Sequence, residues 1–116
     1  MLERCASTDP YFSREQAGPA VADYLRDTDP MHPLASPARA DLANLAPVLV
    51  HASDCEVLAD DATLIAESIA TAGGEVELGL WPEMTHVWHA MTPHVPEARD
   101  AVDQVATFIR ARLTAD

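Results

Sequence analysis

Residues Pro47–Ala52 read PVLVHA, a short apolar run that does not alternate with polar residues and that includes one histidine. An unbroken run of this kind is typical of a strand that helices bury on both faces. Strands buried in this way belong to parallel sheets, whose connections pass over the sheet through crossover helices. The run therefore predicts an inner strand of an α/β domain.

The residues after this run predict a crossover helix. A loop at Ser53–Ala59 comes first, and Asp60 or Asp61 follows in a position to cap the helix. Gly73-Gly74 is expected to end it in a left-handed turn. The predicted apolar face comprises Leu64, Ile65, Ile69, Ala62, Ala66 and Ala70.

A second strand is predicted at Glu75–Leu80, where apolar and other residues alternate. Val76, Leu78 and Leu80 are set against Glu75, Glu77 and Gly79, which is typical of a half-buried strand. A strand, a helix and a strand form a right-handed parallel unit, so both strands should end at the same edge of the sheet.

Two further helices are expected outside this unit. One lies near residues 14–26, with Ser13 and Gln16 as a capping box and with an interruption or delay at Gly18-Pro19. The proline-rich segment Asp29–Pro37 then predicts a surface loop. The last helix begins at Pro96, with an apolar face of Val102, Val105, Phe108, Ile109 and Leu113. The fold class is therefore α/β, in the order helix, strand, helix, strand, helix, with two parallel strands.

Composition bounds the class of protein. A chain of 116 residues that is 48% hydrophobic makes one globular domain or part of one. Its net charge of -12 repels phosphate backbones, so no nucleic-acid partner is expected. It has no apolar run long enough for a membrane span and no signal-peptide pattern, which predicts a cytoplasmic protein. Cys5 and Cys55 form no Cys-x-x-Cys pair and are expected to be two thiols without a disulfide.

Chemistry is concentrated in the two loops at the predicted sheet edge. The loop Pro82–His89 carries His86, and the loop Ser53–Ala59 carries Asp54 and Glu56. A carboxylate that accepts a hydrogen bond from Nδ1 of a histidine leaves Nε2 able to take a proton. The two loops can therefore form the orienting half of a triad, in the chain order of α/β-hydrolases. The alternative is that His86 is a loop histidine bonded to backbone.

The nucleophile of such a triad is missing from the chain. None of the five serines lies between two glycines in the pattern Gly-x-Ser-x-Gly, and no His-Gly-Gly-Gly run is present. The four glycines provide no place for the strained turns that a nucleophile elbow and an oxyanion hole require.

Three segments carry a resemblance to a known family. They read DPMHPLASP at residues 29–37, LAPVLVHASDCEVLADD at 45–61 and VELGLWPEMTHVWH at 76–89. In this order they resemble the C-terminal part of bacterial esterases of the hormone-sensitive-lipase-like family, and the likeness covers nearly the whole chain. It implies a carboxylic-ester hydrolase in which Glu56 is the acid and His86 the histidine of a Ser-Glu-His triad, with Asp54 as a rival acid.

The same resemblance implies further properties of the chain. The serine and the oxyanion-hole segment would lie upstream of Met1, so residues 1–116 are expected to be a partial α/β-hydrolase domain that is inactive by itself. Short-chain esters are the expected substrates once the missing N-terminal part is supplied, and no cofactor or metal is implied. Strand 75–80 is the expected contact of a homodimer. A truncated gene product and a separately encoded remainder both stay open.

Two alternatives stay open beside the esterase. His86, His89 and His94, with Glu83 or Glu97 nearby, could form a metal site, although their spacing fits no strong template. The chain could also be a non-catalytic interaction module that uses its acidic surface and a sheet edge.

Overall fold

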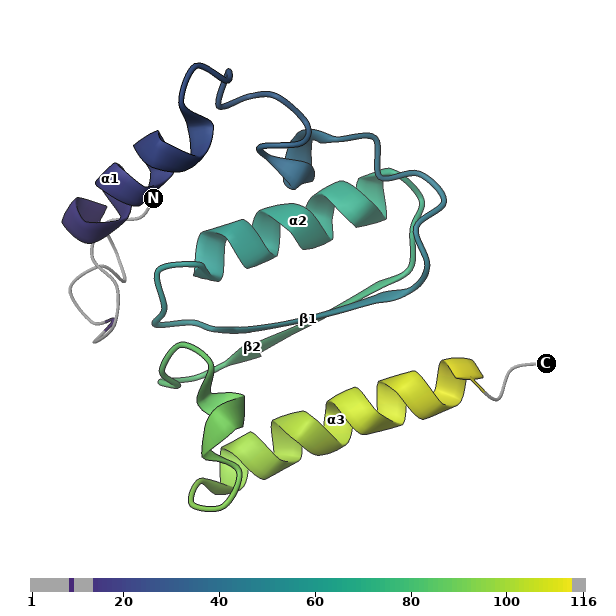
Figure 1. The fold of residues 1–116 in the computed structure, drawn as a ribbon. Coiled ribbons are helices and arrows are strands. Elements are labelled where there is room, and N and C mark those ends of the chain that lie inside the picture. The colour runs from purple at the N-terminus through teal and green to yellow at the C-terminus, as the bar shows by residue number, and fades with distance from the viewer. Residues whose placement is uncertain (1–8, 10–13, 114–116) are drawn as a thin grey trace. The chain divides into compact units, whose positions relative to one another are not determined.

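A computed structural model of the chain describes Asp9 and residues 14–113. The elements labelled in Figure 1, together with two 3-10 helices η1 and η2, are α1 (Arg14–Leu25), η1 (Pro37–Arg39), β1 (Val48–Ser53), α2 (Ala59–Thr71), β2 (Val76–Trp81), η2 (Trp88–Met91) and α3 (Pro96–Leu113). The predicted order of helix, strand, helix, strand, helix is confirmed. The contacts of the chain divide it into two compact units, Met1–Thr85 and His86–Asp116.

The sheet of the first unit is the parallel pair that the sequence predicts. Val48 pairs with Val76 and Ser53 with Trp81, so both strands end at the same edge. Each strand begins and ends one residue later than predicted. In the part of the chain that the structure describes, β1 has β2 as its one strand neighbour, so the prediction of an inner strand is not met there.

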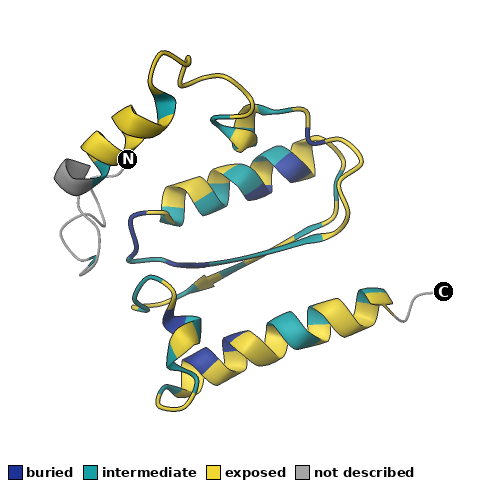
Figure 2. Ribbon diagram, in the orientation of Figure 1, coloured by how far each residue is buried: buried dark blue, intermediate teal, exposed yellow. Residues whose placement is uncertain are grey.

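Helix α2 packs along the sheet with one side only, as Figure 2 shows. Ala66 and Ile69 are buried, and Ala62 and Ile65 are half-buried. These positions follow the helical spacing of three and four residues, and they form one face. The predicted face was too wide, because Leu64 and Ala70 are exposed. Leu64 lies about 140° around the helix from Ile69, the nearest buried position.

The two ends of α2 differ in how well the sequence predicted them. The helix begins at Ala59, and its N-cap residue Leu58 offers no capping side chain. Asp60 and Asp61 lie in the first turn, so the prediction that one of them caps the helix was wrong; their charges favour the helix dipole instead. At the other end Gly73 has φ +82°, which confirms the predicted left-handed glycine.

We expect Ile69→Ala to lower the free energy of unfolding by about 2–5 kcal/mol, because Ile69 is 1% exposed and its removal leaves a cavity under α2. Leu64→Ala is the matched control on the same helix. Leu64 is 40% exposed, so this change should cost no more than about 1 kcal/mol. Urea unfolding followed by circular dichroism measures both. Equal losses for the two variants would contradict the orientation of α2.

The burial of β2 differs from the prediction. Its alternation predicts a buried face of Val76, Leu78 and Leu80, but Leu78 is 37% and Leu80 48% exposed. Gly79 and Trp81, on the other face, are half-buried. Trp81 lies edge-on to His51 of β1, with the ring centroids 5.9 Å apart. A Cβ on residue 79 would lie 3.0 Å from Cδ2 of His51, so the absence of a side chain on Gly79 makes room for this ring.

In the second unit, η2 lies against α3. Ala98 and Ala101 of α3 are fully buried, and Val105 and Phe108 continue the same face at half-burial. The predicted apolar face was shifted around the helix, because Val102, Ile109 and Leu113 are exposed. The guanidinium of Arg112 lies 3.7 Å from the centroid of the Phe108 ring and shields it. None of the helices in the described ranges is long and apolar enough to cross a membrane.

Helix α1 runs through the position where an interruption was predicted. Pro19 is the sixth residue of the helix, which continues to Leu25. A proline at this position removes one intrahelical hydrogen bond, and the helix nevertheless continues past it. The predicted cap residue Ser13 lies outside the described residues.

Candidate active site

The first candidate loop is a tight turn directly after β1. The N–H of Ser53 donates to Oε1 of Glu56 at 2.8 Å, and the N–H of Cys55 donates to Oγ of Ser53 at 3.1 Å. The N–H of Ala59 donates to the carbonyl oxygen of Glu56 at 3.2 Å, which leads directly into α2. The turn therefore holds Glu56 in place through its own backbone and the adjacent serine.

Glu56 is a buried acid. It is 5% exposed, and Ser53 beside it is fully buried. A carboxylate removed from water is destabilised unless it is hydrogen-bonded, and the Ser53 N–H meets part of that requirement. Burial at the carboxyl end of a parallel strand is the environment expected of an orienting acid. Of the two candidate acids, Glu56 is the one with this environment.

Asp54, the rival acid, is half-buried and is engaged elsewhere. Its Oδ1 accepts a hydrogen bond of 2.9 Å from the N–H of Glu83, in the loop that leaves β2. Its own N–H donates to the carbonyl oxygen of Trp81 at 3.0 Å, which extends the parallel ladder by one step. Asp54 thus joins the bases of the two candidate loops.

His86 lies in this second loop and is the first residue of the second unit. It is half-buried. On either side of it the backbone is left-handed, with φ of +56° at both Glu83 and Val87. Left-handed conformations are uncommon for residues with a side chain and concentrate at functional positions, especially for a β-branched residue such as Val87.

The predicted site residues are divided between the two units. Asp54 and Glu56 share one turn of the first unit, and the hydrogen bond from Glu83 brings that turn to the base of the histidine loop. His86 belongs to the second unit.

The histidines of the alternative metal site do not form a cluster. Among Asp9 and residues 14–113, no group of three or more His, Cys, Asp or Glu side chains is arranged to hold a metal ion. His89 stacks against Trp88 instead, with ring centroids 4.1 Å apart, and Trp88 is 2% exposed. His94 is exposed. The metal-binding alternative gains no support from this arrangement.

The sequence did not indicate that Asp9 contacts the turn that holds Glu56. Its Oδ2 accepts a hydrogen bond of 3.0 Å from the N–H of Val57, the residue after Glu56. The two residues are 48 positions apart, so no local pattern could have indicated the contact. Cys5 lies outside the described residues, and the state of the two thiols stays a prediction.

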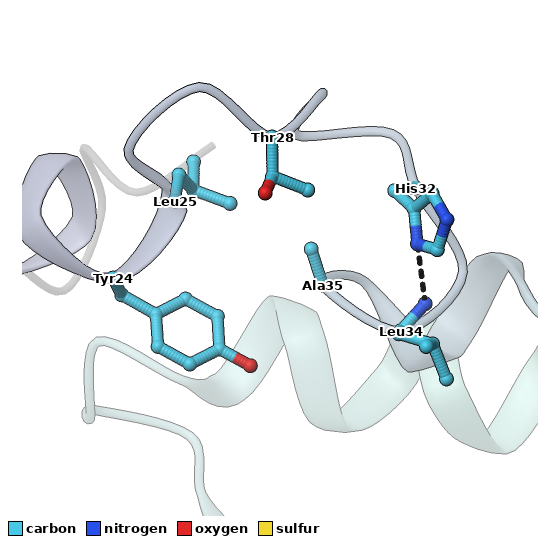
Figure 3. Close-up of a pocket in the computed structure, with 6 residues that line it drawn as sticks. All are labelled: Tyr24, Leu25, Thr28, His32, Leu34 and Ala35. Atoms are coloured by element: carbon cyan, nitrogen blue, oxygen red, sulfur yellow. Dashed lines mark hydrogen bonds between the residues drawn. The ribbon is translucent and has the colours of Figure 1, made fainter.

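A pocket of about 430 Å³ lies between the end of α1 and the turns that follow it (Figure 3). It is lined by Tyr24, Leu25, Thr28, His32, Leu34 and Ala35. Nδ1 of His32 accepts a hydrogen bond of 3.2 Å from the N–H of Leu34. None of the lining residues belongs to the two candidate loops, so the pocket is separate from the Glu56 turn.

Comparison with known proteins agrees with this arrangement. A family model described as the alpha/beta hydrolase fold matches residues 2–90. The chain therefore belongs to the α/β-hydrolase fold family. Among its relatives, an acetyl-hydrolase of Streptomyces hygroscopicus is 47% identical over 87 residues. A carboxylesterase/phospholipase, LipF, of Mycobacterium tuberculosis is 43% identical over 68 residues.

Solved structures narrow the class to hormone-sensitive-lipase-like α/β-hydrolases. The chain matches the crystal structure of a hormone-sensitive lipase from a metagenome library with a TM-score of 0.90 and 32% identity over 96% of its length. It matches the esterase EstE5 with a TM-score of 0.93 and 35% identity over 98%. The chain spans 38% of each of these structures, 29% of the acetyl-hydrolase and 18% of LipF.

Proposed function

We propose that the chain supplies the acid and the histidine of a Ser-Glu-His triad to a carboxylic-ester hydrolase, with Glu56 and His86 in these roles. The observation that carries the proposal is the buried carboxylate of Glu56 in a hydrogen-bonded turn at the carboxyl end of β1. Membership of the α/β-hydrolase family and the esterase relatives support the reaction class.

In the proposed mechanism, Nε2 of His86 takes the proton of a serine hydroxyl as the serine oxygen attacks the ester carbonyl. His86 then returns that proton to the departing alcohol, which leaves an acyl-serine. A water molecule then attacks the acyl carbonyl while His86 takes its proton. His86 returns this proton to the serine oxygen, and the carboxylic acid is released. Glu56 accepts the hydrogen bond from Nδ1 of His86, which fixes the tautomer and stabilises the imidazolium that forms. The serine and the oxyanion donors would come from a segment outside residues 1–116.

The proposal predicts that the 116-residue chain by itself hydrolyses p-nitrophenyl acetate no faster than a comparable set of surface histidines does. We define a hybrid enzyme in which the chain replaces the matching C-terminal segment of the acetyl-hydrolase of Streptomyces hygroscopicus, which is 47% identical over 87 residues. The hybrid should hydrolyse the ester, while the upstream part alone and the chain alone should not. Turnover by the chain alone that disappears with His86→Ala would contradict the proposal.

Three further expectations belong to this proposal. Short-chain esters are the expected substrates, and the cytoplasm is the expected compartment. A homodimer through β2 is the expected assembly, since Leu78 and Leu80 leave an apolar surface on that strand. A purely structural interaction module remains the second candidate. It has the same exposed strand in its favour, but it does not explain why the Glu56 carboxylate is buried.

A further inference from the structure

Asp54 makes two hydrogen bonds to the strand and loop that lead to His86. Its N–H donates to the carbonyl oxygen of Trp81 at 3.0 Å, and its Oδ1 accepts from the N–H of Glu83 at 2.9 Å. The first bond continues the β1–β2 ladder beyond Ser53. The second bond lies two residues past the end of β2. The backbone of Asp54 is therefore hydrogen-bonded to β2, and its side chain is hydrogen-bonded to the loop that follows β2.

Glu83, which donates the second hydrogen bond, lies at the turn of this loop. Glu83 has φ of +56°, a conformation that residues with a side chain adopt only when their surroundings hold it. A side-chain oxygen that accepts the Glu83 N–H stabilises such a turn, because it gives a partner to a backbone donor beyond the strand ladder. Glu83 precedes His86 by three residues, so the direction of the loop at Glu83 sets where the histidine backbone begins.

The carboxylates of Asp54 and Glu56 are held differently. Glu56 is 5% exposed and is bonded within its own turn, whereas Asp54 is half-buried and reaches the neighbouring loop. This difference separates an orienting acid from a residue that positions backbone. The hydrogen bond from Glu83 requires an acceptor oxygen at the Asp54 Oδ1 position and does not require a negative charge.

We propose that Asp54 is a positioning residue, whose side-chain oxygen holds the loop Pro82–Thr85 and thereby places His86 for proton transfer. The inference rests on the proposed role of His86 as the general base. Asp54 touches neither substrate nor reacting atoms in this role. Loss of the acceptor should therefore affect the chemical step more than substrate binding, because the loop would carry the histidine away from its productive position.

Kinetics of the hybrid enzyme test the functional half of the proposal. Asp54→Ala removes the acceptor and should lower kcat by about 10- to 100-fold with little change in KM. Asp54→Asn keeps an oxygen for the Glu83 N–H and should restore kcat to within about threefold of the original. Asp60→Ala, on the exposed first turn of α2, is the matched control and should change neither constant. An Asn variant as impaired as the Ala variant would overturn the proposal and favour Asp54 as the triad acid.

Amide hydrogen exchange tests the structural half without requiring catalysis. In the 116-residue chain, NMR should show that Asp54→Ala speeds exchange of the Glu83 amide by at least about tenfold, while Asp54→Asn leaves it slow. The Ala62 amide, which donates to the carbonyl oxygen of the N-cap residue Leu58, is the internal reference and should change less than about twofold. Equal Glu83 exchange in the original chain and in Asp54→Ala would overturn the inference even if the hybrid is inactive. An inactive hybrid with the expected exchange pattern would instead count against the proposed triad.

Discussion

Replacing Glu56 with glutamine in the hybrid enzyme is expected to lower kcat on the order of 10⁴-fold, with a much smaller effect on KM. The proposed role of Glu56 is to accept the Nδ1 hydrogen of His86, and an amide in its place can hold the wrong tautomer of the imidazole. Glutamine also presents an NH2 group to the turn in which Oε1 of Glu56 now accepts from the Ser53 N–H. In addition, the substitution removes the negative charge of Glu56, which in the proposed role stabilises the imidazolium of His86.

Controls for this experiment come from the same region. Glu67→Gln changes an exposed acid of α2 and should leave kcat unaltered. His86→Ala in the hybrid should be at least as damaging as Glu56→Gln, and the double variant should be little worse than either, because residues of one triad act as a unit. If the Glu56→Gln hybrid is nearly normal and the Asp54→Asn hybrid is inactive, the triad acid is Asp54 and not Glu56.

The 116-residue chain by itself is expected to associate, and Leu80→Lys is expected to weaken that association at least about tenfold. Trp81 directs its carbonyl oxygen at Asp54, and backbone groups alternate in direction along a strand. The N–H groups of Leu78 and Leu80 therefore point away from β1, toward the open edge of β2. Leu78 and Leu80 also expose their side chains on the sheet face beside this edge, so β2 offers both backbone groups and apolar surface to a second copy.

Sedimentation of three proteins tests this expectation. The original chain should sediment as a dimer at concentrations where the Leu80→Lys variant is a monomer. Leu34→Lys adds the same charge at an 82% exposed leucine outside the sheet and should behave like the original. A monodisperse monomer with slowly exchanging amides at Val48–Val50 would show that the chain closes its own core and has no need of a partner.

The sequence was sufficient to predict the order and direction of the helices and strands, but it did not predict correctly which face of each one is buried. The run at Pro47–Ala52 and the alternation at Glu75–Leu80 predicted two parallel strands, since periodicity depends on local geometry. Alternation records which residues of a strand are apolar and not whether that face meets a partner. Leu78 and Leu80 are exposed for this reason, although their pattern is that of a buried face.

The candidate site was predictable in its residue types and less so in their roles. Asp54 and Glu56 lie two positions apart on one turn, and spacing alone does not say which carboxylate is buried. The structure distinguishes them through the Ser53 N–H on Glu56 and the Glu83 N–H on Asp54. Contacts between distant parts of the chain, such as that of Asp9 with Val57, leave no trace in local sequence.

The two tryptophans of the chain lie one in each compact unit, with Trp81 at the end of β2 and Trp88 at the start of η2. Their surroundings differ, since Trp81 is half-buried with its ring edge-on to His51 and Trp88 is almost completely buried and stacked on His89. With either indole replaced by phenylalanine, the remaining one gives a fluorescence signal from one unit alone. The chain thus carries two built-in spectroscopic probes, which can distinguish units that unfold together from units that unfold in sequence.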